Sequence, residues 1–325
     1  MTNWTRESLM ELARNFRECR ILLTGVELNL FTLVASSPLG AEEIVDRTGA
    51  NPRALVILLN ALTAMGLLMK EGGKYRCEPS ASFLLSENSP DSVLPMIHHS
   101  KNLWERWSNL TKVVGGHCIK EQSQETCTRS FIGAMQVIAA PQAASIVAKV
   151  NPGSARQLLD VGGGPGTYTL AFLQAVPEMR ATLFDRPEVI EIARAQMKEE
   201  GVANRVSLLS GDYLSDPLPP GHDLAFLSAI IHQHSLQQNS DLYRNVYRSL
   251  KAGGRIIVRD HVLEPHRTSP KAAALFAVNM LVGTEGGNCY TLHEIREGLM
   301  EAGFIRVALI NPDTLMDGLV EAFKP

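Results

Sequence analysis

The run Leu158-Leu159-Asp160-Val161-Gly162-Gly163-Gly164-Pro165-Gly166-Thr167-Tyr168-Thr169-Leu170 decides the fold of this 325-residue chain. Apolar residues lead up to Asp160, four glycines follow within five positions, and a helix-forming segment (168–175) comes next. Glycine has no Cβ, so a cluster of glycines lets the backbone turn sharply and lets a ligand come close to it. The run therefore predicts a buried strand that turns tightly into a helix, with a ligand site at the turn.

The spacing of the glycines separates two kinds of cofactor site. The dinucleotide-binding fingerprint requires glycine at its first, third and sixth positions. Counted from Gly162, the sixth position is Thr167, which weakens a dehydrogenase as an alternative. The spacing instead reads Asp160-x-Gly162-x-Gly164-x-Gly166, which resembles the first motif of the class I S-adenosylmethionine-dependent methyltransferases. That resemblance implies S-adenosylmethionine as the cofactor, with Asp160, Gly162 and Gly164 in contact with it.

The composition is that of a globular protein with room for two domains. Hydrophobic residues make up 45% and charged residues 20% of the chain. The net charge of −3 argues against nucleic acid or an anionic membrane as a partner. We find no apolar run that approaches membrane-spanning length and no signal peptide. Five cysteines without a Cys-x-x-Cys spacing predict free thiols in a cytoplasmic protein.

Residues 1–92 are predicted to fold as a winged-helix domain. Apolar residues at helical spacing predict a helix over 5–35 and a shorter one that stops at Gly49. The pair Asn51-Pro52 then starts another helix, with asparagine as its N-cap and proline in its first turn. Two short strands on either side of Glu71-Gly72-Gly73 complete the pattern as a hairpin, the wing.

DNA binding and dimerisation are the two roles open to such a domain. A recognition helix needs exposed Arg or Lys side chains that reach phosphates and base edges. The helix after Asn51 offers only Arg53 and is otherwise apolar, which favours contact with another protein surface. The sequence therefore predicts a homodimer formed through this domain and no nucleic-acid partner. A DNA-binding, ligand-sensing regulator is the alternative from another class.

The rest of the chain is predicted to be an α/β domain, residues 151–325, joined by a helical connector, residues 93–150. Alternating strands and helices predict a Rossmann-like, doubly wound parallel sheet with its ligands at the carboxyl ends of the strands. The expected strands are 157–161, 181–184, 206–210, 223–228 and 255–259, with helices that include 187–199 and 240–250. The last segments are predicted to add an antiparallel edge pair, at 304–310 and 319–323.

Polar side chains follow three of these strands and are candidates for cofactor contact. Asp185 ends the second strand, where a carboxylate can accept both hydroxyls of a ribose. Asp212 and Tyr213 follow the third strand, where the carboxylate can receive an adenine amino group and the phenol ring can cover the adenine. Ser228 ends the fourth strand and is a further candidate. The carboxyl ends of parallel strands meet at one edge, so we expect all four side chains there.

His232 follows the fourth strand and is the candidate general base. A neutral imidazole at the ligand edge is suited to take a proton from a hydroxyl group. His234 lies two positions further on, but the spacing supplies no third ligand, so no metal site is predicted. Candidates for the wall of a substrate pocket lie on the helical segments, at Trp107, Met135 and Asn279.

Successive motifs make a more specific resemblance. The chain resembles, over nearly its whole length, the small-molecule O-methyltransferases related to caffeate and acetylserotonin O-methyltransferases. The matching motifs follow in the family's order at 160–166, 184–187, 211–213 and 250–255. The resemblance implies a dimerisation domain, a hydroxylated, aromatic or polyketide-like substrate, and His232 as the base.

The chain also departs from the family's pattern around the base. Gln233 and His234 stand where the family has Asp and Trp. Of two carboxylates that steady the base, the first falls at Asp260, which would orient His232, and the second falls near Cys289, which cannot act in the same way. Such departures leave N- or C-methylation, or a cofactor-dependent activity that works by proximity without a base, as alternatives.

Overall fold

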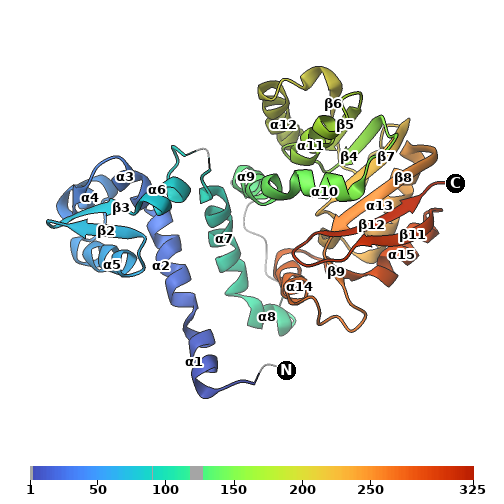
Figure 1. The fold of residues 1–325 in the computed structure, drawn as a ribbon. Helices are drawn as coiled ribbons and strands as arrows, with labels where there is room; N and C mark the ends of the chain where they lie inside the picture. The colour runs from blue at the N-terminus through green and yellow to red at the C-terminus, as the bar shows by residue number, and fades with distance from the viewer. Residues whose placement is uncertain (1–2, 90, 118–126) are drawn as a thin grey trace. The chain divides into compact units, whose positions relative to one another are not determined.

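A computed structural model describes residues 3–89, 91–117 and 127–325, and the side chains of 127–130 lie outside this description. The chain forms two compact units (Figure 1). The first comprises Met1–Trp104 with Arg129–Ala134, and the second comprises Glu105–Thr128 with Met135–Pro325. The predicted connector, residues 93–150, is therefore divided between the two units. Its first part joins the core of the first unit through Leu94, whereas its last part packs into the second unit. The three-part division of the chain stays a prediction.

The first unit is a helical domain with a small antiparallel sheet. The sheet has the order β1-β3-β2, and the predicted hairpin forms its β2 and β3. Its elements are α1 (Arg6–Arg14), α2 (Phe16–Glu27), α3 (Leu30–Ala35), β1 (Leu39–Gly40), α4 (Ala41–Thr48), α5 (Pro52–Ala64), β2 (Leu68–Glu71), β3 (Lys74–Cys77), α6 (Pro79–Leu85) and α7 (Leu94–Trp107).

Local capping sets the helix boundaries of this unit. The backbone N–H of Ala54 donates to Oδ1 of Asn51 over 3.0 Å, which caps α5 as predicted. The single helix expected over 5–35 is wrong, because the chain breaks at Asn15 and again at Asn29. Asn29 has a φ of +51°, a left-handed conformation that asparagine tolerates better than most residues and that a continuous helix cannot contain.

The second unit is built on a seven-stranded sheet with the order β11-β12-β8-β7-β4-β5-β6. The five strands from β8 to β6 are parallel, and β12 and β11 add the predicted antiparallel pair at one edge. The strands are β4 (Gln157–Val161), β5 (Arg180–Asp185), β6 (Val206–Ser210), β7 (His222–Ser228), β8 (Leu250–Asp260), β11 (Ile305–Asn311) and β12 (Gly318–Phe323). Successive strands are added to one side of β4 and then to the other, which is where a doubly wound sheet binds ligands.

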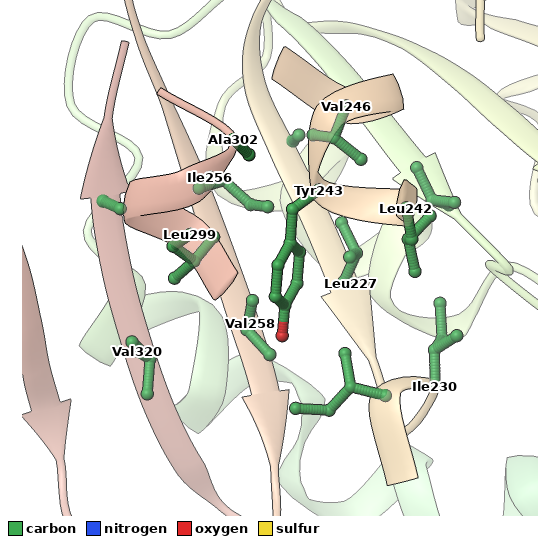
Figure 2. Packing of buried hydrophobic residues seen from close by; sticks show 14 of the residues in the cluster. Leu227, Ile230, Leu242, Tyr243, Val246, Ile256, Val258, Leu299, Ala302 and Val320 are labelled. Atoms are coloured by element: carbon green, nitrogen blue, oxygen red, sulfur yellow. The ribbon is translucent and has the colours of Figure 1, made fainter. Parts of the chain in front are cut away.

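Helices cover both faces of this sheet and enclose two apolar cores. The helices α10 (Ala143–Val150) and α11 (Thr167–Ala175) bury Ile146 and Phe172 on one face. Figure 2 shows the other face, where Tyr243 lies among side chains from β7, β8, β12, α13 (Leu236–Ser249) and α15 (Leu292–Glu301). The remaining elements are α8 (Leu110–Val114), α9 (Cys127–Ala139), η1 (Ala140–Gln142), α12 (Pro187–Glu199), η2 (Ala203–Arg205), η3 (Ile231–Gln233), β9 (Val262–Leu263), α14 (Lys271–Gly283) and β10 (Tyr290–Thr291).

One apolar stretch reaches membrane-spanning length, which was not expected from the sequence. Phe131–Val150, which runs through α9, η1 and α10, is long and apolar enough to cross a membrane by length and composition alone. Its last part is a core element, because Ile146, Val147 and Val150 of α10 are buried against α11 and the sheet. The expectation of no such run is therefore corrected, and the apolar face of α10 is explained by packing.

Asp160 lies directly beneath the glycine-rich turn between β4 and α11. It is 1% exposed, and its Oδ2 accepts a hydrogen bond of 2.6 Å from Oγ1 of Thr169 in α11. A Cβ added to Gly163 would come within 2.9 Å of the same oxygen. Burial raises the pKa of Asp160 to about 7, because the ionised carboxylate is poorly solvated there.

We expect the Asp160→Asn variant to lose less stability than the wild type as the pH rises from 4 to 7. In the unfolded chain this carboxyl ionises near pH 3.9, whereas the folded protein holds its proton up to about pH 7. The free energy of unfolding therefore falls as the pH rises through this window, by on the order of 3 kcal/mol. The amide cannot ionise, so the variant should lose less stability than the wild type when Tm is measured at pH 4.5 and 7.5 without ligand. Asp46→Asn, at an exposed position of α4, is the control. Parallel pH profiles for Asp160→Asn and the wild type would contradict this origin of the pH dependence.

Candidate active site

The glycine-rich turn is filled on its inner side and open on its outer side. A Cβ at Gly163 would lie 2.8 Å from Cγ of Leu183, which no side chain tolerates. At Gly164 a Cβ would meet nothing within 4 Å, and its φ of +58° is one that L residues rarely adopt. The backbone of the turn is therefore pressed against the sheet and presents its outer side to a ligand.

Asp185, at the end of β5, holds this turn from the neighbouring strand. Its Oδ2 accepts a hydrogen bond from the backbone N–H of Gly164 over 2.8 Å, and its Oδ1 accepts one from the backbone N–H of Arg186 over 2.7 Å. The side chain is 8% exposed, and burial raises its pKa above the ordinary value. Each oxygen of a carboxylate accepts two hydrogen bonds, so both retain capacity for ligand hydroxyl groups.

The segment after β6 places Tyr213 beside the turn and leaves Asp212 exposed. The Tyr213 hydroxyl lies 3.0 Å from Nε2 of His234, and a Cβ on Gly162 would lie 3.4 Å from the Tyr213 ring. Burial raises the pKa of Tyr213 and lowers that of His234, so the pair is held in its neutral form. Asp212 accepts a hydrogen bond from the backbone of Leu214 over 2.9 Å.

The structure thus places Gly162, Gly164, Asp185 and Tyr213 around one turn. This agrees with the expectation that residues at the carboxyl ends of parallel strands lie at one edge of the sheet. It places Asp160 below the turn rather than on its open side. Whether these side chains touch a cofactor stays a prediction.

His232 and Asp260 form a buried pair at the same edge of the sheet. His232 lies in η3, just after β7, and Asp260 ends β8; they are 6% and 1% exposed. Nδ1 of His232 lies 2.8 and 3.0 Å from the two carboxylate oxygens. Burial alone would raise the pKa of Asp260, but the charge and hydrogen bond of His232 outweigh it and hold that pKa below its usual value. An ionised carboxylate only accepts, so Nδ1 carries the proton that faces Asp260, and in the neutral form of the ring Nε2 is the nitrogen with the free lone pair.

The backbone of His232 is fixed by neighbouring segments. Its carbonyl accepts a hydrogen bond of 2.9 Å from the N–H of Asn288, and the Asn239 amide donates to the Ile231 carbonyl over 2.8 Å. A Cβ on Gly287 would lie 2.4 Å from the His232 carbonyl oxygen, so only glycine fits at this point. The imidazole is therefore held from the carboxylate side and from the main chain.

Helix α14 forms a wall next to this pair. The ring of Phe276 meets the His232 ring edge to face, with 4.9 Å between centroids. Three residues further along the same face, Oδ1 of Asn279 accepts a hydrogen bond of 2.9 Å from Nε1 of Trp107. The structure therefore joins two of the predicted pocket residues, Trp107 at the end of α7 and Asn279 on α14, the helix that borders His232. Met135 lies half-buried on α9, and its place in a pocket wall stays a prediction.

The positions that depart from the family's pattern have other partners in the structure. Cys289 is 1% exposed and packs with Leu263 and Ala273, and burial raises the pKa of its thiol. Gln233 donates to the Ala229 carbonyl over 3.2 Å, and His234 holds Tyr213. Cys289 therefore fills apolar space, which a carboxylate could not do without a partner.

Two features of the site were not predicted from the sequence. Arg259, next to Asp260 in β8, is 3% exposed and donates to Oγ of Ser228 over 3.1 Å. His261 lies 2.7 Å from Asp313, which comes from the distant loop between β11 and β12. Arg259 interrupts the apolar run of β8, and that interruption is a signal the sequence contains. The partner of His261 is 52 residues away, and nothing local indicates it.

Among the described residues, no three His, Cys, Asp or Glu side chains lie close enough together to hold a metal ion. Cys19, Cys77 and Cys289 are free thiols. Two further cysteines, Cys118 and the side chain of Cys127, lie outside the described residues.

Comparisons with known proteins identify the family. Residues 103–305 match the model of an O-methyltransferase domain, and residues 10–87 match an O-methyltransferase dimerisation domain. The chain is 31% identical over 325 residues to the tetracenomycin polyketide synthesis 8-O-methyl transferase TcmO of Streptomyces glaucescens, with 95% of each chain covered.

Two further similarities agree. The 3-hydroxy-5-methyl-1-naphthoate 3-O-methyltransferase of Streptomyces sahachiroi is 29% identical over 312 residues, which cover 93% of this chain and 90% of that one. Among solved structures, PigF with SAH, from a Serratia species, has a TM-score of 0.89 at 25% identity and covers 99% of this chain and 100% of its own. The chain therefore belongs to the O-methyltransferase family, as an S-adenosylmethionine-dependent enzyme with an N-terminal dimerisation domain.

Proposed function

We propose that this protein is a homodimeric O-methyltransferase that methylates a hydroxyl group of a small aromatic or polyketide-like metabolite, with His232 as general base. The observation that carries the proposal is the buried His232–Asp260 pair at the sheet edge that also bears the glycine-rich turn. The names of two relatives, a polyketide 8-O-methyl transferase and a naphthoate 3-O-methyltransferase, support the substrate class.

The residues around the turn fit S-adenosylmethionine. The spare lone pairs of Asp185 suit ribose hydroxyl groups, and Asp212 with Tyr213 lies one strand further along, where the adenine would follow. The open side of Gly164 and the backbone of Gly162 admit the sulfur-bearing part, which Ser228 would also meet. When bound, this cofactor supplies a methyl group on a positively charged sulfur, which transfers to an oxygen held in line behind it.

The protein's own task is to hold the acceptor oxygen and to remove its proton. Nε2 of His232 would take that proton, and Asp260 would stabilise the imidazolium that forms. Both groups are buried, so their interaction is stronger than it would be in water. Alignment of the reacting atoms contributes several kcal/mol in addition. Trp107 and Asn279 would line the acceptor pocket, together with Met135.

We expect His232→Ala to lower kcat by about 10²- to 10⁴-fold while the Kd for S-adenosylhomocysteine changes less than about twofold. The variant removes the proton acceptor but leaves the glycine-rich turn and Asp185 intact. Turnover is measured as S-adenosylhomocysteine release with a panel of hydroxylated aromatics, and NMR of the product locates the new methyl group. Unchanged turnover would contradict the role of His232 and favour catalysis by proximity, and a methyl group on nitrogen or carbon would contradict O-methylation.

Asp260→Asn should reduce kcat by a similar factor, because an amide can donate to Nδ1 and so turn the ring into the wrong tautomer. The double variant His232→Ala, Asp260→Asn should be no slower than His232→Ala alone, since the two groups act as one unit. Gln233→Ala, which changes the adjacent residue outside the pair, is the control. Additive losses in the double variant would show that Asp260 acts independently of His232.

Helix α1 is the candidate dimer contact. None of its residues is buried in the single chain, and its Leu9 and Leu12 are 50% and 57% exposed. A short isolated helix is only marginally stable in water, so we expect a partner surface to cover these leucines. We expect the double substitution Leu9→Glu, Leu12→Glu to convert the dimer to monomer in light scattering after size exclusion. Leu236→Glu, at an exposed leucine of α13, should leave the dimer intact. A dimer that survives the α1 substitutions would place the interface elsewhere.

A further inference from the structure

Arg259 is a buried cation with no counter-ion among the residues that the structure describes. It is 3% exposed, and Nη1 makes its one hydrogen bond, to Oγ of Ser228. Its Nε and Nη2 are out of contact with solvent and have no hydrogen-bond partner. Within the part of the chain that the structure describes, no carboxylate forms an ion pair with it. An unpaired buried charge is destabilising by several kcal/mol, so its presence at this place requires an explanation.

The surroundings of the guanidinium group do not neutralise it. It lies 5.1 Å from the centroid of the Tyr168 ring, and the Tyr168 hydroxyl is itself buried and unpartnered. An aromatic face contributes only a small attraction to a cation. A buried polar group that lacks a partner in the protein requires an explanation, and a bound ligand that supplies the partner is one.

The sheet places Arg259 in line with the glycine-rich turn. Ser228 in β7 pairs with Arg259 in β8, and Val161 pairs with Leu227, so Gly162, Ser228 and Arg259 follow one another across the sheet edge. The proposed adenosine site lies on the opposite side of β4, over β5 and β6. Adjacent strands are about 4.8 Å apart, so Ser228 lies two strands, roughly 10 Å, from Asp185. A cofactor whose adenosine covers β5 and β6 would extend its amino-acid end over β4 to Ser228.

The backbone next to Ser228 has a conformation that is common at ligand sites. The next residue, Ala229, has a φ of +57°, which is unfavourable for a residue with a Cβ and is common at ligand sites. Its N–H donates to the Arg259 carbonyl over 2.8 Å, which keeps the ends of the two strands together. The half-exposed Ser228 hydroxyl accepts from Arg259, and this hydrogen bond does not use the hydroxyl's own hydrogen.

We propose that Ser228 and Arg259 form the subsite for the carboxylate of the cofactor's amino-acid end. Ser228 donates its hydroxyl hydrogen to the carboxylate, and Arg259 acts behind it as a positioning residue. The guanidinium group of Arg259 orients the Ser228 hydroxyl and places a positive charge near the carboxylate. Arg259 in turn gains the anion that it lacks in the protein alone. This inference rests on the proposed cofactor site.

The test compares three ligands that differ at one end only: S-adenosylmethionine, decarboxylated S-adenosylmethionine and 5′-methylthioadenosine. Isothermal titration should show that the wild type binds S-adenosylmethionine about ten- to a hundredfold more tightly than its decarboxylated form. Arg259→Met should bind the two equally well and keep the wild-type affinity for 5′-methylthioadenosine. Arg259→Lys should recover part of the discrimination, and Ser228→Ala should lose part of it.

Arg255→Met is the matched control, because Arg255 lies four residues before Arg259 in β8 and pairs with Glu321. This variant should lose stability and retain the discrimination. Without ligand, Arg259→Met should have a Tm equal to or above that of the wild type, since it removes an unpaired buried charge. A lower Tm with discrimination intact would overturn the proposal and leave Arg259 a structural role.

The remaining outcomes separate this inference from the cofactor site. If the wild type binds 5′-methylthioadenosine but discriminates no carboxylate, the subsite is wrong and the cofactor site stands. If neither adenosine compound binds, the cofactor site itself is wrong, and the subsite falls with it. If Arg259→Met changes only the KM of a carboxylated acceptor, the anion belongs to the substrate and the proposal is overturned.

Discussion

The close fit of the glycine-rich turn onto the sheet is the constraint on which the rest of the site depends. Asp160 and Leu183 occupy the space where a side chain of Gly163 would lie, so the turn can open only outwards. Asp185 then fixes the turn from the next strand through the N–H of Gly164. The position of β4 in the sheet divides the edge into two halves. The proposed adenosine side has β5 and β6, and the proposed reactive side has β7 and β8.

Buried ionisable side chains are a second feature of this edge of the sheet. Asp160, Asp185, Asp260 and Arg259 are each less than a tenth exposed, although they come from three different strands, β4, β5 and β8. Burial of Asp160, Asp185 and Arg259 costs stability in the absence of ligand, and the apolar cores on the two faces of the sheet offset that cost. In return, charges in a poorly solvated environment interact strongly with whatever binds beside them. The arrangement of His232 against Asp260 uses this effect inside the protein, whereas Arg259 has no such partner there.

Much of the fold could be predicted because its signals are local or periodic. The helix over 187–199, the cap at Asn51 and the strand over 157–161 each depend on residues within a few positions of one another. The meeting of His232 and Asp260 was predictable as well, because parallel strands end at the same edge. The breaks at Asn15 and Asn29 were missed, since apolar spacing continues across them. Three other features depend on distant segments that only the folded chain brings together. They are the burial of Asp160 below the turn, the unpartnered guanidinium nitrogens of Arg259 and the contact of His261 with Asp313.

The departures from the family's pattern are better understood as one connected change than as separate losses. His234, which stands where the family has Trp, lies 3.0 Å from the Tyr213 hydroxyl, and Tyr213 packs beside Gly162. The segment that carries His232 is thereby tied directly to the segment proposed to cover the adenine. Cys289 contributes no charge, so Asp260 is the carboxylate that faces the imidazole, and it contacts Nδ1 through both oxygens. An imidazole held by one bidentate contact, and joined through its own loop to the glycine-rich turn, needs no second carboxylate to keep its ring in place.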